Sequence, residues 1–329
     1  MRIKFKSCIF LLTVGQSGAN MRSCVISIII FLTMFCPPAS GKDEWRKLSR
    51  DRIILYCTPA DLKNGEEVID IAEKVIPGIA ADLKLNQIAT IAIVMAPSQK
   101  VFRQLTGGQF PEWGIGGADA GQSVIYLQSP RIAQTSRQLP RVVAHELSHV
   151  LLGQAVSRKP VDRWFDEGFA MYESGDMGIS GSVQLAWNLL SDNPLLLYDV
   201  DDILSFQRFK ANLAYQISFS AVQYLVDTYG SDALADLSQA LGRGLDMDEA
   251  LVHSVGVNYQ AFENGWFETA RRKYRWYILY DFRLLSGTGM VFLFILAFII
   301  TRQRTRKRKH EWMLEVDNDQ PSEKNQTQI

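Results

Sequence analysis

The segment from Arg141 to Leu152 constrains the chain most, because it reads Arg-Val-Val-Ala-His-Glu-Leu-Ser-His-Val-Leu-Leu. His145 and His149 are four residues apart, so on a helix both imidazoles lie on one face, about one turn apart. Pro140 suits the first position of such a helix, and Gly153 suits a position just past its end. We therefore expect a helix that presents two nitrogen donors on one face.

Two imidazole nitrogens in this arrangement can bind one Zn²⁺ at about 2.0–2.1 Å each. Glu146 lies beside the first histidine and can reach a water on the metal without ligating it. A catalytic zinc site usually has three protein ligands and one open position. Of the remaining histidines, His253 lies far along the chain and His310 follows the last apolar run. The better third ligand is a carboxylate on a following antiparallel helix, and Glu167, separated from His149 by 17 residues, supplies one.

Segments on either side of this motif differ in their patterns. Three β-rich apolar runs predict strands, and two segments with apolar residues at helical spacing predict helices. The strands cover residues 52–57, 88–95 and 123–128, and the helices cover 66–83 and 98–105. We expect a bend or break at Pro77-Gly78 and a glycine-rich connection over 114–121. The sequence pattern after Pro140 predicts helices throughout. Strands followed by helices imply an α+β domain.

The motif and its neighbourhood resemble a known family. Val-Val-Ala-His-Glu-Leu-Ser-His, followed by Trp-Phe-Asp-Glu-Gly-Phe-Ala, looks like the gluzincin metallopeptidases, with the bacterial peptidase MA-like group as the closest match. The order of Gly107-Gly108, Pro111-Glu112-Trp113 and Gly117-Ala118 before a strand and the histidine helix is similar to that group, as is the stretch from Ala214 to Gly230. The resemblance covers about residues 45–272 and is densest over 141–173.

This resemblance implies a fold and a set of roles. The fold is a small twisted, mostly antiparallel sheet packed on the histidine helix and followed by a mostly helical lower subdomain. His145, His149 and Glu167 would hold one Zn²⁺ per chain, and Glu146 would be the catalytic base. The activity implied is hydrolysis of peptide bonds by a zinc-activated water.

Some further roles stay open at this point. Tyr215 falls where the family pattern places an aromatic hydroxyl, so it is the candidate donor to the oxyanion, with a core position as its competing interpretation and His253 as an alternative donor. Asp166 or Glu173 is expected to accept a hydrogen bond from a ligating imidazole, and the residues alone do not choose between them. The strand at 123–128 is expected to be an edge strand that pairs with extended substrate backbone.

Both ends of the chain predict an exported, membrane-anchored protein. An apolar run at 25–35, followed by Pro37-Pro38 and small residues, predicts a signal peptide within 1–41, with Met21 as an alternative start and a membrane anchor as the competing interpretation. The uncharged run at 284–301 predicts a transmembrane helix near the short end of a span, with a buried core helix as its alternative. The basic tail at 302–329 would then be cytoplasmic. The domain at 42–275 would lie outside the cytoplasm, on the membrane of a bacterial cell.

Composition excludes a class of partner and narrows the function. Thirty-five basic and thirty-five acidic residues give zero net charge, which argues against nucleic acid as a partner. We therefore expect an endopeptidase that acts on protein or peptide substrates and contacts the lipid bilayer through residues 284–301. An inactive peptide-binding relative and a zinc hydrolase with a non-peptide substrate are the alternatives. Asp119 leaves exopeptidase activity open, although the Met-Glu-Asn type of signature that holds a substrate amine is missing from this loop.

Overall fold

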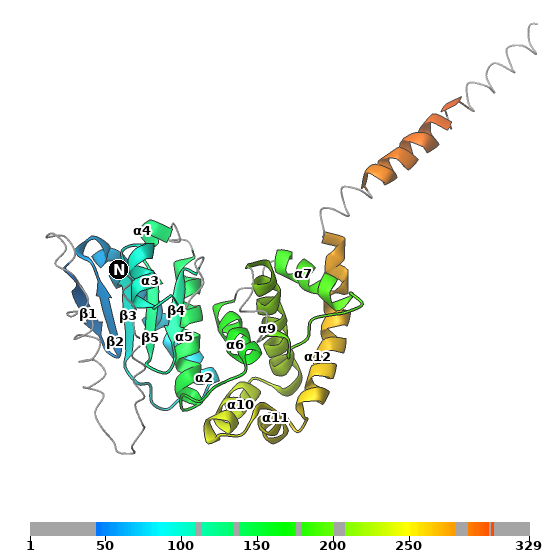
Figure 1. The fold of residues 1–329 in the computed structure, drawn as a ribbon. Helices are drawn as coiled ribbons and strands as arrows, with labels where there is room; N and C mark the ends of the chain where they lie inside the picture. The colour runs from blue at the N-terminus through cyan, green and yellow to red at the C-terminus, as the bar shows by residue number, and fades with distance from the viewer. Residues whose placement is uncertain are drawn as a thin grey trace, which may run out of the picture.

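The computed structural model describes residues 44–108, 114–133, 138–175, 179–200, 208–280, 289–302 and 304–305. A five-stranded sheet comes first and a series of helices follows it (Figure 1). The α+β class predicted from the sequence is therefore confirmed.

The sheet has the strand order β1-β2-β3-β5-β4. Its strands are β1 (Arg46–Arg50), β2 (Ile53–Cys57), β3 (Ile91–Ala96), β4 (Gly116–Asp119) and β5 (Val124–Gln128). The outer pairs β1–β2 and β4–β5 are antiparallel, but the inner pairs β2–β3 and β3–β5 are parallel. The expectation of a mostly antiparallel sheet is therefore wrong. β3 runs parallel to β2 because the crossover helix α2 (Leu62–Asp82) returns the chain to the end of the sheet at which β2 began.

The edge strand next to the histidine helix is β4, not the strand predicted at 123–128. That predicted strand corresponds to β5, which lies between β3 and β4 and has both sides paired. β4 forms within the segment expected to be a glycine-rich connection. Because glycine weakens a strand and gives no alternating pattern, composition alone does not reveal this strand.

Helix α2 shows a second departure from the sequence pattern. It is one continuous helix that begins four residues before the predicted start and contains Pro77 in its interior. Pro77 and Gly78 are both exposed, so water can satisfy the carbonyl that proline leaves without its helical donor. The bend or break expected at this point therefore does not end the helix. The predicted short helix is α3 (Gln99–Leu105), capped by Ser98, and its Leu105 packs against the small buried cluster of Tyr56, Val94 and Val124 on the opposite sheet face.

The histidine helix is α5 (Leu139–Ala155), and it packs on the sheet face that α2 also covers. Gly153 lies inside this helix instead of past its end, where the sequence placed it. A Cβ atom at Gly153 would lie 2.7 Å from Cβ of Ala120, so the missing side chain lets α5 approach the turn between β4 and β5. Glycine is thus required here by close packing and not by a helix cap.

The second half of the described chain is helical, as predicted. Its elements are α6 (Arg163–Ser174), α7 (Ile179–Leu189), α9 (Arg208–Tyr229), α10 (Asp232–Arg243), α11 (Met247–Val255), α12 (Tyr259–Tyr274) and the 3₁₀ turn η2 (Arg275–Tyr280). α6 lies between α5 and α9 and packs on both (Figure 1). Trp164, Phe262 and Trp266 are buried among these helices and belong to the same hydrophobic cluster as the sheet.

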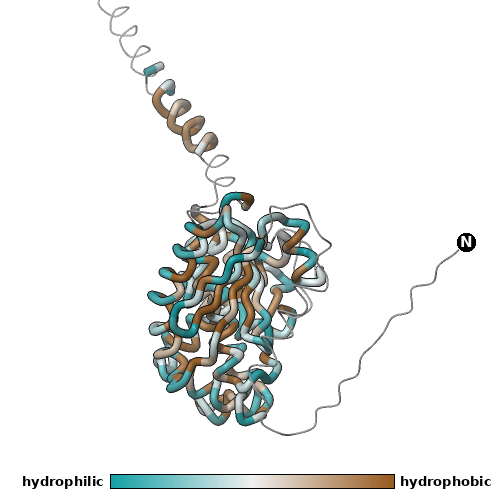
Figure 2. The backbone as a smooth tube through the Cα atoms, turned by 90° about the vertical axis from the view of Figure 1, so that its left-hand side faces the viewer, coloured by the Kyte–Doolittle hydropathy of each residue, from teal (hydrophilic) through white to brown (hydrophobic). Residues whose placement is uncertain are grey.

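The chain ends bear on the membrane predictions. The expected signal region at 1–41 lies outside the described residues. Residues 289–302 are helical and overlap the run at 284–301 that was predicted to span a membrane, and Figure 2 shows most of this helix as hydrophobic. Over the described part of the chain, no helix combines the length and apolar character needed to cross a membrane. The spanning helix at 284–301 therefore stays a prediction, and its first residues lie outside the described ranges.

Candidate metal centre

Two helices bring three candidate donor atoms into one triangle. Nε2 of His145 and Nε2 of His149, both on α5, are 3.2 Å apart. Each lies 3.6 Å from Oε2 of Glu167 on α6. A tetrahedral zinc site with bonds of about 2.05 Å has ligand-to-ligand edges of about 3.3 Å. The triangle therefore has the size and the donor chemistry that a zinc ion requires, and among the described residues no fourth candidate donor joins it.

The positions of these donors follow from the packing of α5 and α6. Leu147 and Val150 are fully buried on α5, and the helical period places the two histidines on the opposite side of the helix from them. On α6, Phe165 and Phe169 are fully buried, and Glu167 lies between them on the less buried face. Both helices thus present their polar faces to one another because their apolar faces are held in the core.

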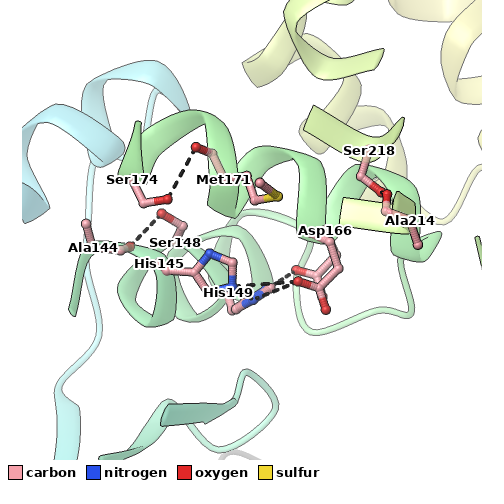
Figure 3. Close-up of polar contacts among 10 residues, drawn as sticks. Ala144, His145, Ser148, His149, Asp166, Met171, Ser174, Ala214 and Ser218 are labelled. Carbon is pink, nitrogen blue, oxygen red and sulfur yellow. Dashed lines mark hydrogen bonds and ion pairs between the residues drawn. The ribbon is translucent and has the colours of Figure 1, made fainter. Parts of the chain in front are cut away.

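Asp166 is the carboxylate that accompanies the triangle. Its Oδ1 lies 2.7 Å from Nδ1 of His149, and Figure 3 shows this contact beside the two imidazoles. When Nδ1–H donates to this carboxylate, Nε2 of His149 keeps a lone pair for a metal ion. Between the two carboxylates that the sequence left open, the structure pairs Asp166 with the histidine.

Glu173 lies elsewhere, at the end of α6. It faces Asp82, the last residue of α2, and its buried Oε1 has no hydrogen-bond partner among the described residues. Burial, and then the neighbouring Asp82 carboxylate, raise the pKa of Glu173 to about 8. Glu173 is therefore explained by its contact with α2 and not by the metal centre.

The charge balance of the triangle favours binding of a cation. Burial alone would lower the pKa of His149, but Asp166, Glu167 and Glu146 raise it to about 10. Without a metal the imidazole therefore carries a proton at neutral pH, and a metal ion has to displace that proton. Metal affinity is accordingly expected to weaken as the pH falls.

Glu146 is buried between the triangle and the edge strand, with 7% of its surface exposed. Its Oε1 approaches Gly116 of β4 so closely that a Cβ atom there would lie 2.6 Å away. Burial raises the pKa of Glu146, and the electrostatic influence of the two neighbouring histidines, His145 and His149, opposes this rise. The carboxylate is thus adjacent to the donor triangle without being part of it.

Tyr215 on α9 is half-buried and faces the same site. Burial, followed by the carboxylates of Glu167 and Glu146, raises the pKa of its hydroxyl, while Arg163 lowers it. Because two carboxylates of the site act on this hydroxyl, Tyr215 lies near the triangle. Its pKa keeps the hydroxyl protonated at neutral pH, so it can donate a hydrogen bond.

Two other residues singled out in the sequence have different surroundings. His253 is on α11, exposed, and its Nε2 lies 3.2 Å from Nη2 of Arg243 on α10. Asp119 closes the turn between β4 and β5, where its Oδ1 accepts a hydrogen bond of 3.0 Å from the backbone N–H of Gln122. These contacts within local structure account for both side chains.

The glycines at 114, 116, 117 and 121 were expected to let backbone approach the cleft closely, and the structure singles out Gly116 among them. The local sequence pattern alone does not separate Gly116 from the glycines around it. Only the position of α5 against β4 shows that the absence of a side chain at Gly116 leaves room for Glu146.

Comparison with known proteins identifies a family. The family model of the Peptidase MA superfamily matches residues 110–271, a range that contains β4, α5, α6 and α9. The search of curated proteins yields no match.

Proposed function

The part of the chain from residue 110 to residue 271 belongs to the peptidase MA superfamily, and from this premise we propose that the protein is a zinc-dependent endopeptidase. The observation that carries the proposal is the triangle of His145, His149 and Glu167, with the carboxylate of Glu146 buried beside it. A structural site would use all four coordination positions, whereas this triangle leaves one open for catalysis.

In this proposal each side chain has one task. His145, His149 and Glu167 hold the zinc ion, which when bound supplies Lewis-acid polarisation of the scissile carbonyl and acidifies a water. Glu146 accepts the proton of the attacking water on its carboxylate and delivers it to the leaving amine nitrogen as the C–N bond breaks. Tyr215 donates its hydroxyl proton in a hydrogen bond to the oxyanion.

The edge strand supports a peptide as the substrate. Among the described residues, β4 has a strand partner on one side only. An extended peptide can add to such an edge through backbone hydrogen bonds, which do not depend on chain ends. We therefore assign the pairing with substrate backbone, which the sequence led us to expect at residues 123–128, to β4. Asp119 is engaged in its turn, which supports internal cleavage over capture of a free amine.

Location is part of the same proposal. We propose that residues 284–301 tether the protein to a bacterial membrane, with the domain at 42–275 outside the cytoplasm. The described helix at 289–302 supports this, because its large apolar side chains are 41–70% exposed, which suits contact with lipid. Fusion of a reporter phosphatase that is active only after export, placed after residue 280 or residue 329, tests the orientation. Activity of the second fusion alone would contradict it.

The decisive experiment combines metal content with cleavage. The full chain and its Glu146→Gln variant are purified in detergent, and bound metal and hydrolysis of an unfolded casein substrate are measured with and without a chelator. We expect about one zinc per chain in both proteins and cleavage by the wild type only. The exposed variant Glu66→Gln on α2 is the matched control and should cleave like the wild type. A wild type without zinc refutes the ligand assignment, and zinc without cleavage in the wild type refutes peptidase activity.

A further inference from the structure

Gly116 occupies a place where the sheet edge, the histidine helix and the base meet. It is the first residue of β4, paired with Leu127 of the neighbouring strand β5. β4 packs against α5, and Glu146 extends from α5 toward the strand. The carboxylate of Glu146 therefore has the backbone of an edge strand as one wall of its cavity.

Space, not backbone conformation, requires glycine at this position. Gly116 does not have a positive φ, so its backbone is accessible to any residue. An added Cβ would nevertheless lie 2.6 Å from Oε1 of Glu146 and 3.0 Å from its Cδ and Cγ. The first of these contacts is about 0.8 Å shorter than an ordinary van der Waals contact. Even a methyl group at this position has to displace the carboxylate.

Contacts near both ends of β4 hold the strand against its neighbours. The carbonyl of Ile115 accepts a hydrogen bond of 2.8 Å from Gln128 N–H, which ties the start of β4 to the end of β5. At the other end, Gly153 of α5 lies against Ala120, just past β4. Glu146 and Gly153 are seven residues apart, so they share one face of α5, and both contacts set the same helix-to-strand distance.

We propose that Gly116 is a positioning residue whose missing side chain fixes the carboxylate of Glu146 beside the metal-binding triangle. This inference rests on the proposed function. The contact involves the end of a side chain, so a substitution displaces the carboxylate and leaves the fold intact. The three atoms nearest to an added Cβ all belong to Glu146, which is not one of the three ligands, so we expect metal binding to be retained while proton transfer is impaired.

Kinetics test the catalytic part. The full chain in detergent is compared with Gly116→Ala and with Gly121→Ala, a control in the adjoining turn where an added Cβ would meet only Asp119 Oδ1, at 3.3 Å. We expect Gly116→Ala to keep its zinc and its KM and to lose roughly 10- to 100-fold in kcat. Gly121→Ala should retain wild-type kcat. An unchanged kcat in Gly116→Ala, or loss of its zinc, overturns the proposal.

Stability tests the contact without any catalysis. Thermal unfolding of the metal-free chain is measured for Gly116→Ala, Glu146→Ala and the double variant, with Gly153→Ala as a packing comparison. We expect Gly116→Ala to lower the midpoint by about 2–4 °C when Glu146 is present and not when it is replaced. Gly153→Ala should lower the midpoint equally in both backgrounds. If Gly116→Ala lowers the midpoint equally with and without the Glu146 side chain, the proposed contact between position 116 and Glu146 is overturned.

The two experiments also separate this inference from the proposed function. If the wild type cleaves no peptide, the proposed function fails, and the midpoints alone decide whether Gly116 confines Glu146. If the wild type cleaves peptides and the midpoints show no dependence between the two positions, the inference fails while the proposed function stands.

Discussion

Replacing Glu173 by glutamine should remove a pH dependence of stability that the wild-type protein shows between about pH 4.5 and pH 8. Glu173 lies at the end of α6 and faces Asp82 at the end of α2. Burial, and then Asp82, raise its pKa from 4.5 to about 8. The folded protein therefore retains a proton on Glu173 over a pH range in which the unfolded chain has already released it.

The sign and size of the effect follow from this difference. Because the folded state binds more protons in this range, its stability is complete below about pH 4.5 and decreases as the pH rises toward 8. A shift of this size corresponds to about 5 kcal/mol for a fully buried group. Glu173 is only partly buried, so we expect about 2–4 kcal/mol. The neutral amide of Glu173→Gln avoids this cost, and the variant should exceed the wild type in stability by that amount at pH 8.

Urea unfolding of the full chain from pH 4.5 to pH 8.5, with a chelator present to keep metal binding out of the measurement, checks this prediction. The control is Glu66→Gln, which removes an exposed carboxylate from α2 and should follow the wild type at every pH. Parallel curves for Glu173→Gln and the wild type would refute the reasoning, because they would show that Glu173 titrates alike in both states.

Three further substitutions test the remaining polar contacts. Asp166→Asn removes the charged partner of His149 Nδ1 and should weaken zinc binding about 10- to 100-fold, measured by competition with a chromophoric chelator; unchanged affinity would contradict that role. Asp61→Asn should cost about 1–3 kcal/mol at pH 7, because buried Asp61 accepts two hydrogen bonds from Arg131. Burial alone would raise the pKa of Asp61, but hydrogen bonds, led by that of Arg131, lower it. The wild type therefore loses the stability that the Asp61 carboxylate contributes as acid protonates it. Urea unfolding at pH 7 and pH 3 should show a smaller difference between the wild type and Asp61→Asn at pH 3. Tyr215→Phe should reduce kcat about 100-fold with little change in KM, whereas a residue that serves only the core would change the unfolding midpoint and not kcat.

The local part of the site was predictable from the sequence. His145 and His149 are one helical turn apart on any α-helix, so their shared face follows from the period of the helix alone. The apolar pattern of α5 and the proline in its first turn are also local signals, and the structure contains that helix. The proximity of Glu167 to the histidines came from the motif's spacing and its resemblance to a family, and the structure brings the three residues together.

What could not be predicted depends on contacts between distant segments. Asp166 and Glu173 are seven residues apart, so they share one face of α6, and the helical period cannot tell which one meets a histidine. The structure separates them because α5 lies at one end of α6 and the last turn of α2 lies at the other. The strand β4 was missed for a similar reason, since only pairing with β5 makes its glycines a strand.

The arrangement of the core bears on what a metal ion contributes to this protein. One continuous hydrophobic cluster includes Ile93 of the sheet, Leu147 of α5, Phe169 of α6 and Trp266 of α12. The two helices that carry the donors are therefore held by apolar contacts on the sides that face away from the triangle. In small zinc domains the metal supplies the energy of folding, because their chains lack such a core. Here burial already fixes the donors 3.2–3.6 Å apart, so an ion would bind to a site formed by folding, and its contribution would be to chemistry and not to the architecture.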